Sequence, residues 1–290
     1  MSTLWENIYR LDDERRNILI ALSDKGVYPS GDEKFSDFPR LIKSIEVAPR
    51  ANTQVMLFGE YTSRKIIVED TKVLIDFSTI MSVDDMFNGF GSMEYIDLPN
   101  NFARIATSAR SFLDSCALLK SFTFPRNSFK NVKQCTHFFF GCKNLTSISD
   151  INLGVNVLSA DSCFSSCEKL TSLDLSGGFG VNMRHGNLLF RNCKNLQMIN
   201  LPENFASNAI ALYNFFSACT ELMEIHGGIY AKISFSLSDC TKLTHESLMN
   251  VINSLQQVDS QKSLSLGSTN LAKLTDDEKA IATAKGWTLA

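Results

Sequence analysis

A short motif recurs along this chain about every 26 residues, and this recurrence limits the possible folds more than any other feature. Each copy has an aromatic or apolar pair, then Cys (once Phe), then Leu or Met three residues later, then alternating apolar and polar residues. The Cys-equivalent positions are Phe90, Cys116, Cys142, Cys167, Cys193, Cys219 and Cys240. Their spacings are 26, 26, 25, 26, 26 and 21 residues. Regular self-similarity of this length predicts a stack of equivalent coils.

The two halves of each unit make different contributions to such a coil. The half after each Leu alternates apolar and polar residues, as in Leu170-Thr-Ser-Leu173-Asp-Leu175, and predicts a short strand with one buried face. The half before it carries aromatic pairs such as Phe138-Phe139, which we expect to face the core from a helical turn or irregular segment. Neither half buries its apolar face alone, so neighbouring coils must stack. Seven strands would form a ladder on the order of 30 Å long.

The pattern F-x-x-C-x-x-L followed by an alternating strand resembles the BspA-type leucine-rich repeat, which is common in proteins of gut bacteria and their phages. The resemblance covers about residues 74–244. It implies an α/β fold, a leucine-rich-repeat solenoid of about seven coils with a parallel strand ladder. Around it we expect a small helical N-terminal module and a helical C-terminal cap. The family includes surface adhesins and phage appendages.

Composition excludes several partners. The net charge is −3 and no run of Lys or Arg occurs, which disfavours a nucleic-acid partner. No stretch approaches the ~18–20 apolar residues of a membrane helix, so we expect no membrane insertion. The N-terminus lacks the basic start and apolar stretch of a secretory signal, which favours folding in a cytosol. The 21 Phe against 6 Tyr and 2 Trp indicate recurring buried rings.

Residues 245–290 are predicted to be the C-terminal cap that shields the last core layer. One helical face carries Leu248, Val251, Ile252 and Leu255. Residues 263–266 return as a strand, and Thr275 with Glu278 forms a capping box for a last helix. Gly286 lies where a glycine typically ends a helix. The tail also resembles that of leucine-rich-repeat proteins from such bacteria and phages.

Residues 1–47 are predicted to be a helical attachment or oligomerisation module, joined by a linker, 48–53, to the repeats at 54–244. Its first helix has an apolar seam of Leu4, Ile8, Leu11, Ile18 and Leu22. This helix could pack on its own chain, form a homotrimer, or dock onto another virion protein. Residues 25–45 resemble a small N-terminal module of phage tail and virion appendage proteins.

The outward side of the strands is the candidate ligand-binding face. Strand alternation directs two columns of short polar side chains away from the core. The candidate residues are Tyr95, Asp97, Thr123, Ser149, Asp174, Met198, Asn200 and His226. Such a face suits a sugar or a polar protein surface, although a merely solvated sheet would look the same.

The remaining reactive residue types are interpreted as structural. Six cysteines occupy the repeat's own position and are expected to pack between coils, with no disulfide. Cys163-x-x-x-Cys167 lacks a second pair at zinc-like spacing, so no metal is expected. The four histidines are scattered and none is placed by sequence in a catalytic triad. We therefore expect no cofactor and no catalytic residues.

Three functions remain. The favoured hypothesis is a phage virion appendage, such as a tail fibre, whose solenoid binds a host-surface glycan or protein. The alternative is a bacterial cell-surface or secreted leucine-rich-repeat adhesin. The third is a glycan hydrolase, which would need a pair of acidic residues that no sequence motif indicates.

Overall fold

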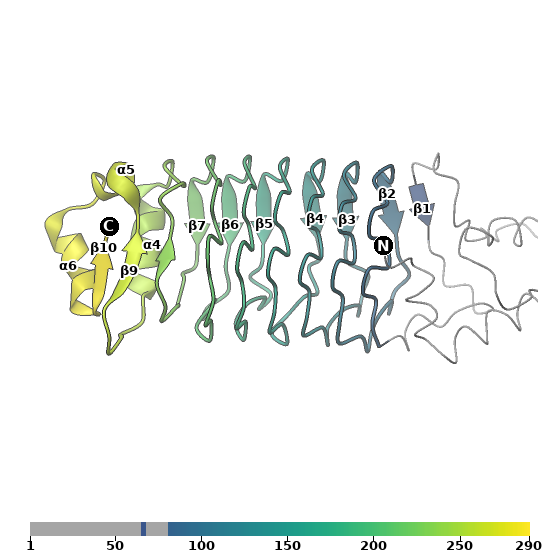
Figure 1. Cartoon of the computed structure of the whole chain (residues 1–290), viewed down its shortest axis with the longest axis horizontal. Coiled ribbons are helices and arrows are strands. Elements are labelled where there is room, and N and C mark those ends of the chain that lie inside the picture. The colour runs from purple at the N-terminus through teal and green to yellow at the C-terminus, as the bar shows by residue number, and fades with distance from the viewer. Residues whose placement is uncertain (1–64, 68–80) are drawn as a thin grey trace, which may run out of the picture.

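The computed structural model describes residues 65–67 and 81–290, in which successive coils lie side by side in a row (Figure 1). One side of the row carries short parallel strands, one from each coil. Their bounds are β1 Lys65–Ile67, β2 Tyr95–Asp97, β3 Ser121–Thr123, β4 Ser147–Ser149, β5 Ser172–Asp174, β6 Met198–Asn200 and β7 Glu224–His226. The strands from β2 onward follow the residues after each motif Leu or Met, as the alternation predicts.

The strands pair in three sheets, β1–β2, β3–β4 and β5–β6–β7, so the expectation of a single ladder is wrong. The break between β4 and β5 falls at the 25-residue spacing between Cys142 and Cys167. The break between β2 and β3 coincides with no irregular spacing. Other bonds still join these coils: Gly141 N–H donates to Ser165 O at 2.9 Å, and Lys120 N–H to Glu94 O at 3.0 Å.

A second ladder, which the sequence did not predict, lies half a coil away from the strands. It consists of parallel bridges that join one residue per coil: Ser82, Ser108, Gln134, Ser159, His185 and Ala211. At the C-terminal end a three-stranded parallel sheet follows, in the order β10-β9-β8. Its strands are β8 Phe235–Ser236, β9 Lys262–Ser265 and β10 Trp287–Leu289. Each coil is therefore tied to its neighbour on two sides.

Aromatic rings fill the space between the two ladders. Phe139, Phe164, Phe190 and Phe216, each three residues before a motif cysteine, are buried. Successive pairs in this set stack with centroids 5.7, 5.7 and 4.8 Å apart. The prediction that the aromatic pairs face the core is confirmed, from a chain of tight turns rather than a helix.

The cysteines pack between coils as predicted. All eight thiols are free and buried. At the repeat's own position, each thiol donates to a carbonyl of the preceding coil; for example, Cys193 Sγ lies 3.1 Å from Phe164 O and Cys219 Sγ 3.0 Å from Phe190 O. Cysteine suits this position because it is small and apolar and still carries a weak donor.

Residues 245–290 contain the helices and the strand that the sequence predicts, with one further helix and one further strand. Helix α4, His245–Ser254, buries the predicted apolar face, and β9 overlaps the expected strand. Helix α6, Asp276–Ala284, begins with the Thr275–Glu278 capping box, and Gly286 follows it with φ of 86°. The short helix α5, Gly267–Leu271, and strand β10 were not predicted.

Helix α4 lies where the next strand beyond β7 would lie, and its side chains cover the exposed edge of β7. Ile225 N–H donates to Ser247 Oγ at 2.9 Å, and Ser247 Oγ donates to Met223 O at 3.0 Å. Asn250 Nδ2 donates to Ile225 O at 3.1 Å. An unpaired strand edge is a template for aggregation, and these bonds remove it.

The predicted N-terminal module, 1–47, and the linker, 48–53, lie outside the described residues, as does the seam of Leu4, Ile8, Leu11, Ile18 and Leu22. Of the repeat segment predicted from residue 54, the part before Met81 is described only at β1. Among residues 65–67 and 81–290, no helix has the length and apolarity to span a membrane.

Candidate functional site

The two predicted columns of polar residues form an outward strand face, the side of β2–β7 that points away from the core. In each strand the central residue is directed inward, such as Leu173 and Ile199. Parallel register aligns Ser172 with Met198 and Asp174 with Asn200. The residues in the flanking columns are exposed or half-buried: Tyr95, Asp97, Ser121, Thr123, Ser147, Ser149, Ser172, Asp174, Met198, Asn200, Glu224 and His226. The predicted orientation of the candidate residues is confirmed, while their role in binding stays a prediction.

At its N-terminal end the outward strand face carries an aromatic ring beside an ion pair. Lys120 Nζ lies 5.2 Å from the centre of the Tyr95 ring and 2.8 Å from Glu94 Oε2. The hydrogen bond to Glu94 raises the pKa of Lys120. Tyr95 is 40% exposed, so its ring offers an amphipathic contact to a ligand.

In its middle the face is built of hydroxyl groups and a charged carboxylate. Thr123 Oγ1 and Ser149 Oγ share a hydrogen bond of 2.9 Å across β3 and β4. Asp174 Oδ1 accepts from Ser176 N–H at 2.9 Å. The hydrogen bonds from Ser176, from its side chain first and then its backbone, lower the pKa of Asp174.

At its C-terminal end the face carries a histidine beside a carboxylate. His226 Nε2 lies 3.0 Å from Glu224 Oε2 on the outward side of β7. The two columns hold three carboxylates, Asp97, Asp174 and Glu224, and no Lys or Arg. Chemically, this surface offers hydrogen bonds and a weak negative charge.

The thiols are poorly suited to nucleophilic catalysis. Burial raises the pKa of Cys193 to about 12 and raises that of Cys167 well above its usual range. These groups therefore stay protonated and closed off from substrate. Two other histidines lie beside single carboxylates, with His245 Nε2 2.8 Å from Glu278 Oε1 and His137 Nδ1 3.9 Å from Asp114 Oδ2.

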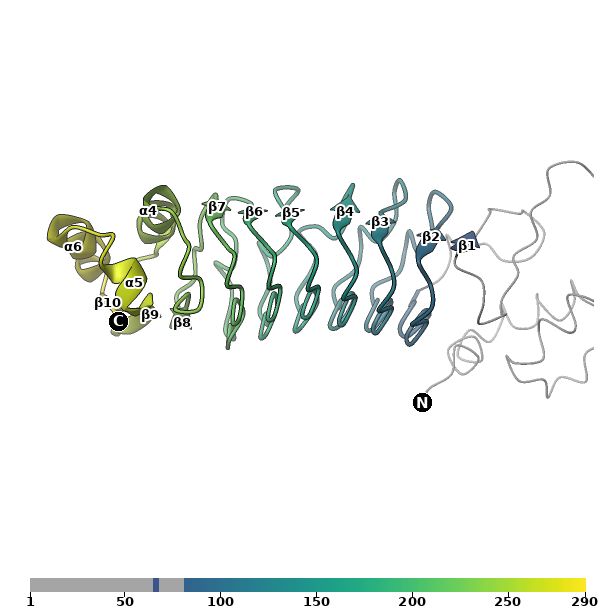
Figure 2. The same cartoon turned by 90° about the horizontal axis from the view of Figure 1, so that it is seen from above.

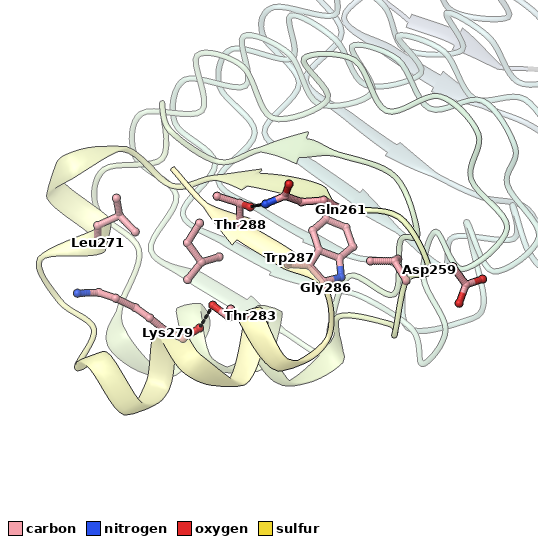
Figure 3. Close-up of a pocket in the computed structure, with 10 residues that line it drawn as sticks. Asp259, Gln261, Leu271, Lys279, Thr283, Gly286, Trp287 and Thr288 are labelled. Atoms are coloured by element: carbon pink, nitrogen blue, oxygen red, sulfur yellow. Dashed lines mark hydrogen bonds between the residues drawn. The ribbon is translucent and has the colours of Figure 1, made fainter.

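A hollow of about 610 Å³ lies at the C-terminal end of the stack, against α6 and β10 (Figure 3). Figure 3 shows Lys279 and Thr283 of α6 along one side, with Thr288 of β10 and Gln261 along the other. The side chain of Gln261 donates to Thr288 Oγ1. The sequence did not predict this hollow, because its lining comes from separate segments that share no motif.

The motif is also matched by a known family model. The model of the BspA type leucine rich repeat region matches the chain in six copies, over residues 83–205 and 185–276. The matched ranges together cover more than half of the chain, including the outward strand face. No curated protein sequence matches the chain.

Proposed function

Because this chain belongs to the BspA-type leucine-rich repeat family, we propose that it is a bacterial cell-surface or secreted adhesin whose outward strand face binds a polar ligand. BspA-type repeats are typical of bacterial surface and secreted proteins, which favours this function over a virion component. The ligand would be a glycan or a protein on another cell surface.

The alignment of the outward strand face is the observation that carries this proposal. Strand register brings one short polar side chain from each coil into line, as in Thr123 with Ser149 and Asp174 with Asn200. A repeat stack offers an extended surface on which a partner can bind along several coils. Short hydroxyl and carboxylate groups lose little rotamer entropy when they bind a polar partner.

Binding of the full chain to fixed epithelial cells, measured by flow cytometry, tests this proposal. The variant Ser147→Arg/Ser172→Arg puts two long cations on the face without touching the core. We expect it to lower the apparent affinity about tenfold or more. The matched control Thr220→Arg/Thr241→Arg changes exposed turn residues by the same chemistry and should bind like the wild type. Equal loss in both variants, or in neither, would contradict the proposal.

Function as a phage virion appendage is a second proposal, supported by the resemblance of residues 25–45 to a virion module and by an N-terminus without the pattern of a secretory signal. The family match does not include those residues. Mass spectrometry of purified phage particles and of surface-labelled bacteria separates the two locations. Peptides of this chain in particles, and their absence from labelled cells, would favour the appendage.

Self-association through the N-terminal seam is likewise a proposal. The solution mass of the full chain should correspond to a homotrimer, and Ile8→Glu/Ile18→Glu should reduce it to a monomer, because buried charge opposes helix association. A full chain that is already monomeric would contradict self-association.

We further propose that the protein has no catalytic activity. Turnover of any member of a broad panel of glycans would overturn this proposal.

A further inference from the structure

The outward side of the second ladder alternates between cationic and apolar side chains. The residues just before four successive bridge positions are Lys133, Leu158, Arg184 and Ile210. Backbone hydrogen bonds hold them in adjacent rungs: Leu158 N–H donates to Lys133 O at 2.8 Å, Arg184 N–H to Leu158 O at 2.9 Å, and Ile210 N–H to Arg184 O at 2.9 Å. At about 4.8 Å per rung, like side chains recur roughly every 10 Å along the stack.

The apolar members of this set are unusually exposed. Ile210 is 55% exposed and Leu158 39%. Tyr213 follows Ile210 by three residues in the same coil. Its side chain is 71% exposed, more than any other large apolar or aromatic side chain among residues 81–290. A single exposed hydrophobic residue needs no explanation, but a cluster rimmed by charge is typical of a binding surface.

The cations of this surface lack carboxylate partners. Lys120, Lys194 and Lys242 each lie within 3.5 Å of a glutamate of the preceding coil. By contrast, Lys133 and Arg184 make no ion pair with any of the residues that the structure describes, and both are exposed.

An acidic residue of this side, Asp161, lies two residues after the bridge position Ser159. Asp161 Oδ1 accepts from Asn187 N–H at 2.6 Å, a bond that ties two coils together. In these four coils, the positions just before, at and two residues after the bridges hold two cations, Lys133 and Arg184, and one carboxylate, Asp161, on a chain of net charge −3. The two columns of the outward strand face, by contrast, hold three carboxylates and no Lys or Arg. An anionic partner would be attracted to one side of the stack and repelled by the other.

We propose that Lys133, Leu158, Arg184, Ile210 and Tyr213 form a cationic ladder face that binds an acidic polysaccharide lying along the stack. A polysaccharide with a carboxylate on every second sugar presents acids and apolar C–H faces in alternation, which complements the alternating cations and apolar side chains of this face. Arginine can bind a carboxylate with two parallel hydrogen bonds, and an exposed tyrosine ring can pack on a sugar face. This site is separate from the outward strand face and goes beyond the adhesin function proposed above.

The experiment measures binding of the full chain to hyaluronan, in which a carboxylate recurs on every second sugar. Dextran serves as the neutral polymer and polyglutamate as a polypeptide anion. We expect hyaluronan to bind in a salt-sensitive manner, and dextran and polyglutamate to bind at least about tenfold more weakly. Absence of hyaluronan binding overturns the proposal, and equal or tighter binding of polyglutamate overturns it in favour of an acidic polypeptide.

Matched variants locate the site. Lys133→Gln/Arg184→Gln should weaken hyaluronan binding about tenfold, and Tyr213→Ala should weaken it severalfold. The control Lys143→Gln/Lys169→Gln removes the same charge from exposed turn positions and should leave binding within about twofold. Equal weakening by the control overturns the assignment. Because Ser147→Arg/Ser172→Arg changes only the outward strand face, hyaluronan binding should survive in it even if cell binding is lost.

Discussion

Six of the coils turn sharply at the residue just before the motif cysteine or its equivalent, Phe90. This residue adopts a left-handed backbone conformation. These residues are Gly89, Ser115, Gly141, Ser166, Asn192 and Ala218, with φ between 59° and 79°. For a residue other than glycine this conformation costs roughly 1–2 kcal/mol. The coil-to-coil bonds hold it in place, since Ser115 N–H donates to Phe140 O and Ser166 N–H to Arg191 O, both at 2.7 Å. Stacking thus offsets a local strain that a single coil could not sustain.

A comparison of Gly89 with Gly227 distinguishes the cost of a left-handed backbone from the cost of a steric clash. Gly89 and Gly227 have φ of 79° and 82°, but a Cβ at Gly89 would meet nothing within 4 Å, whereas one at Gly227 would overlap Leu201 O. We expect Gly89→Ala to cost about 1 kcal/mol and Gly227→Ala at least about 3 kcal/mol of unfolding free energy. Chemical denaturation followed by circular dichroism measures both. Equal losses would show that the clash at Gly227 relaxes.

The buried thiols make the fold sensitive to alkali. Burial raises the pKa of Cys193 and of Cys240 from 9.0 to about 12. The folded state therefore holds these protons more tightly than the unfolded state. Their contribution to stability is complete below pH 9 and is lost as the pH rises towards 12, by roughly 1.4 kcal/mol per thiol per pH unit.

Denaturation midpoints measured across this range test the effect. The midpoint should fall steadily above about pH 9, and Cys193→Ala should start lower at neutral pH but fall less steeply. A midpoint that is constant to pH 11, or an unchanged slope in the variant, would be inconsistent with thiol ionisation on unfolding.

At the scale of elements, α4 shows how a helix can end a strand ladder. A further strand would satisfy the edge of β7 with backbone groups, but α4 uses its own backbone internally. It therefore covers that edge with side chains, among them Ser247, Asn250 and Ser254. Small polar residues on the buried side of an amphipathic helix would otherwise be unfavourable. Here they are hydrogen-bond partners for β7 and the turn after it.

Removing one of these buried hydroxyls should lower the free energy of unfolding more than removing an exposed hydroxyl does. In Ser247→Ala, the buried Ile225 N–H loses its partner, while Met223 O keeps the bond from Thr244 N–H, so we expect a loss of about 1–3 kcal/mol in the free energy of unfolding. The exposed Ser268 in α5 serves as the control, and Ser268→Ala should change stability by less than about 0.5 kcal/mol. Urea unfolding of both variants gives the comparison, and a neutral Ser247→Ala would show that water replaces the hydroxyl.

At the scale of the whole molecule, residues 81–290 form a one-dimensional stack in which each coil depends on its neighbours (Figures 1 and 2). Figure 2 shows β2–β7 along one side of the row and β8–β10 along the other. At the C-terminal end, the sheet β10-β9-β8 continues the side of the second ladder, and α4 covers the edge of β7 on the side of the strands. Two separate surfaces therefore run the length of the stack, and each is available to a different partner.

Deleting residues 245–290 should expose both the β7 edge and the last core layer. Leu248, Val251 and Ile252 are fully buried against that layer, so the truncated chain is expected to aggregate and to bind a hydrophobic dye. Light scattering during refolding measures this. A truncated chain that stays monomeric with an unchanged unfolding midpoint would mean that the last coil needs no cap.

The sequence by itself determined the repeat period, the strand positions and which strand residues point inward. Alternation is a local property, so Leu173 inward and Ser172 and Asp174 outward follow from a few residues. The capping box at Thr275 is equally local and was predicted correctly. The roles of the outward candidate residues, and of residues 1–47, stay predictions.

Only the tertiary structure decided how the coils meet. The second ladder pairs a single residue per coil. These residues differ in type and lie in no alternating segment, so no sequence pattern marks them as paired. Lys133, Leu158, Arg184 and Ile210 recur every 25 or 26 residues, yet their outward direction depends on the left-handed turns and hydrogen bonds around them. The three-way split of the strand ladder has the same origin. Pairing between coils depends on positions accumulated over a whole turn of chain, which local propensities do not fix.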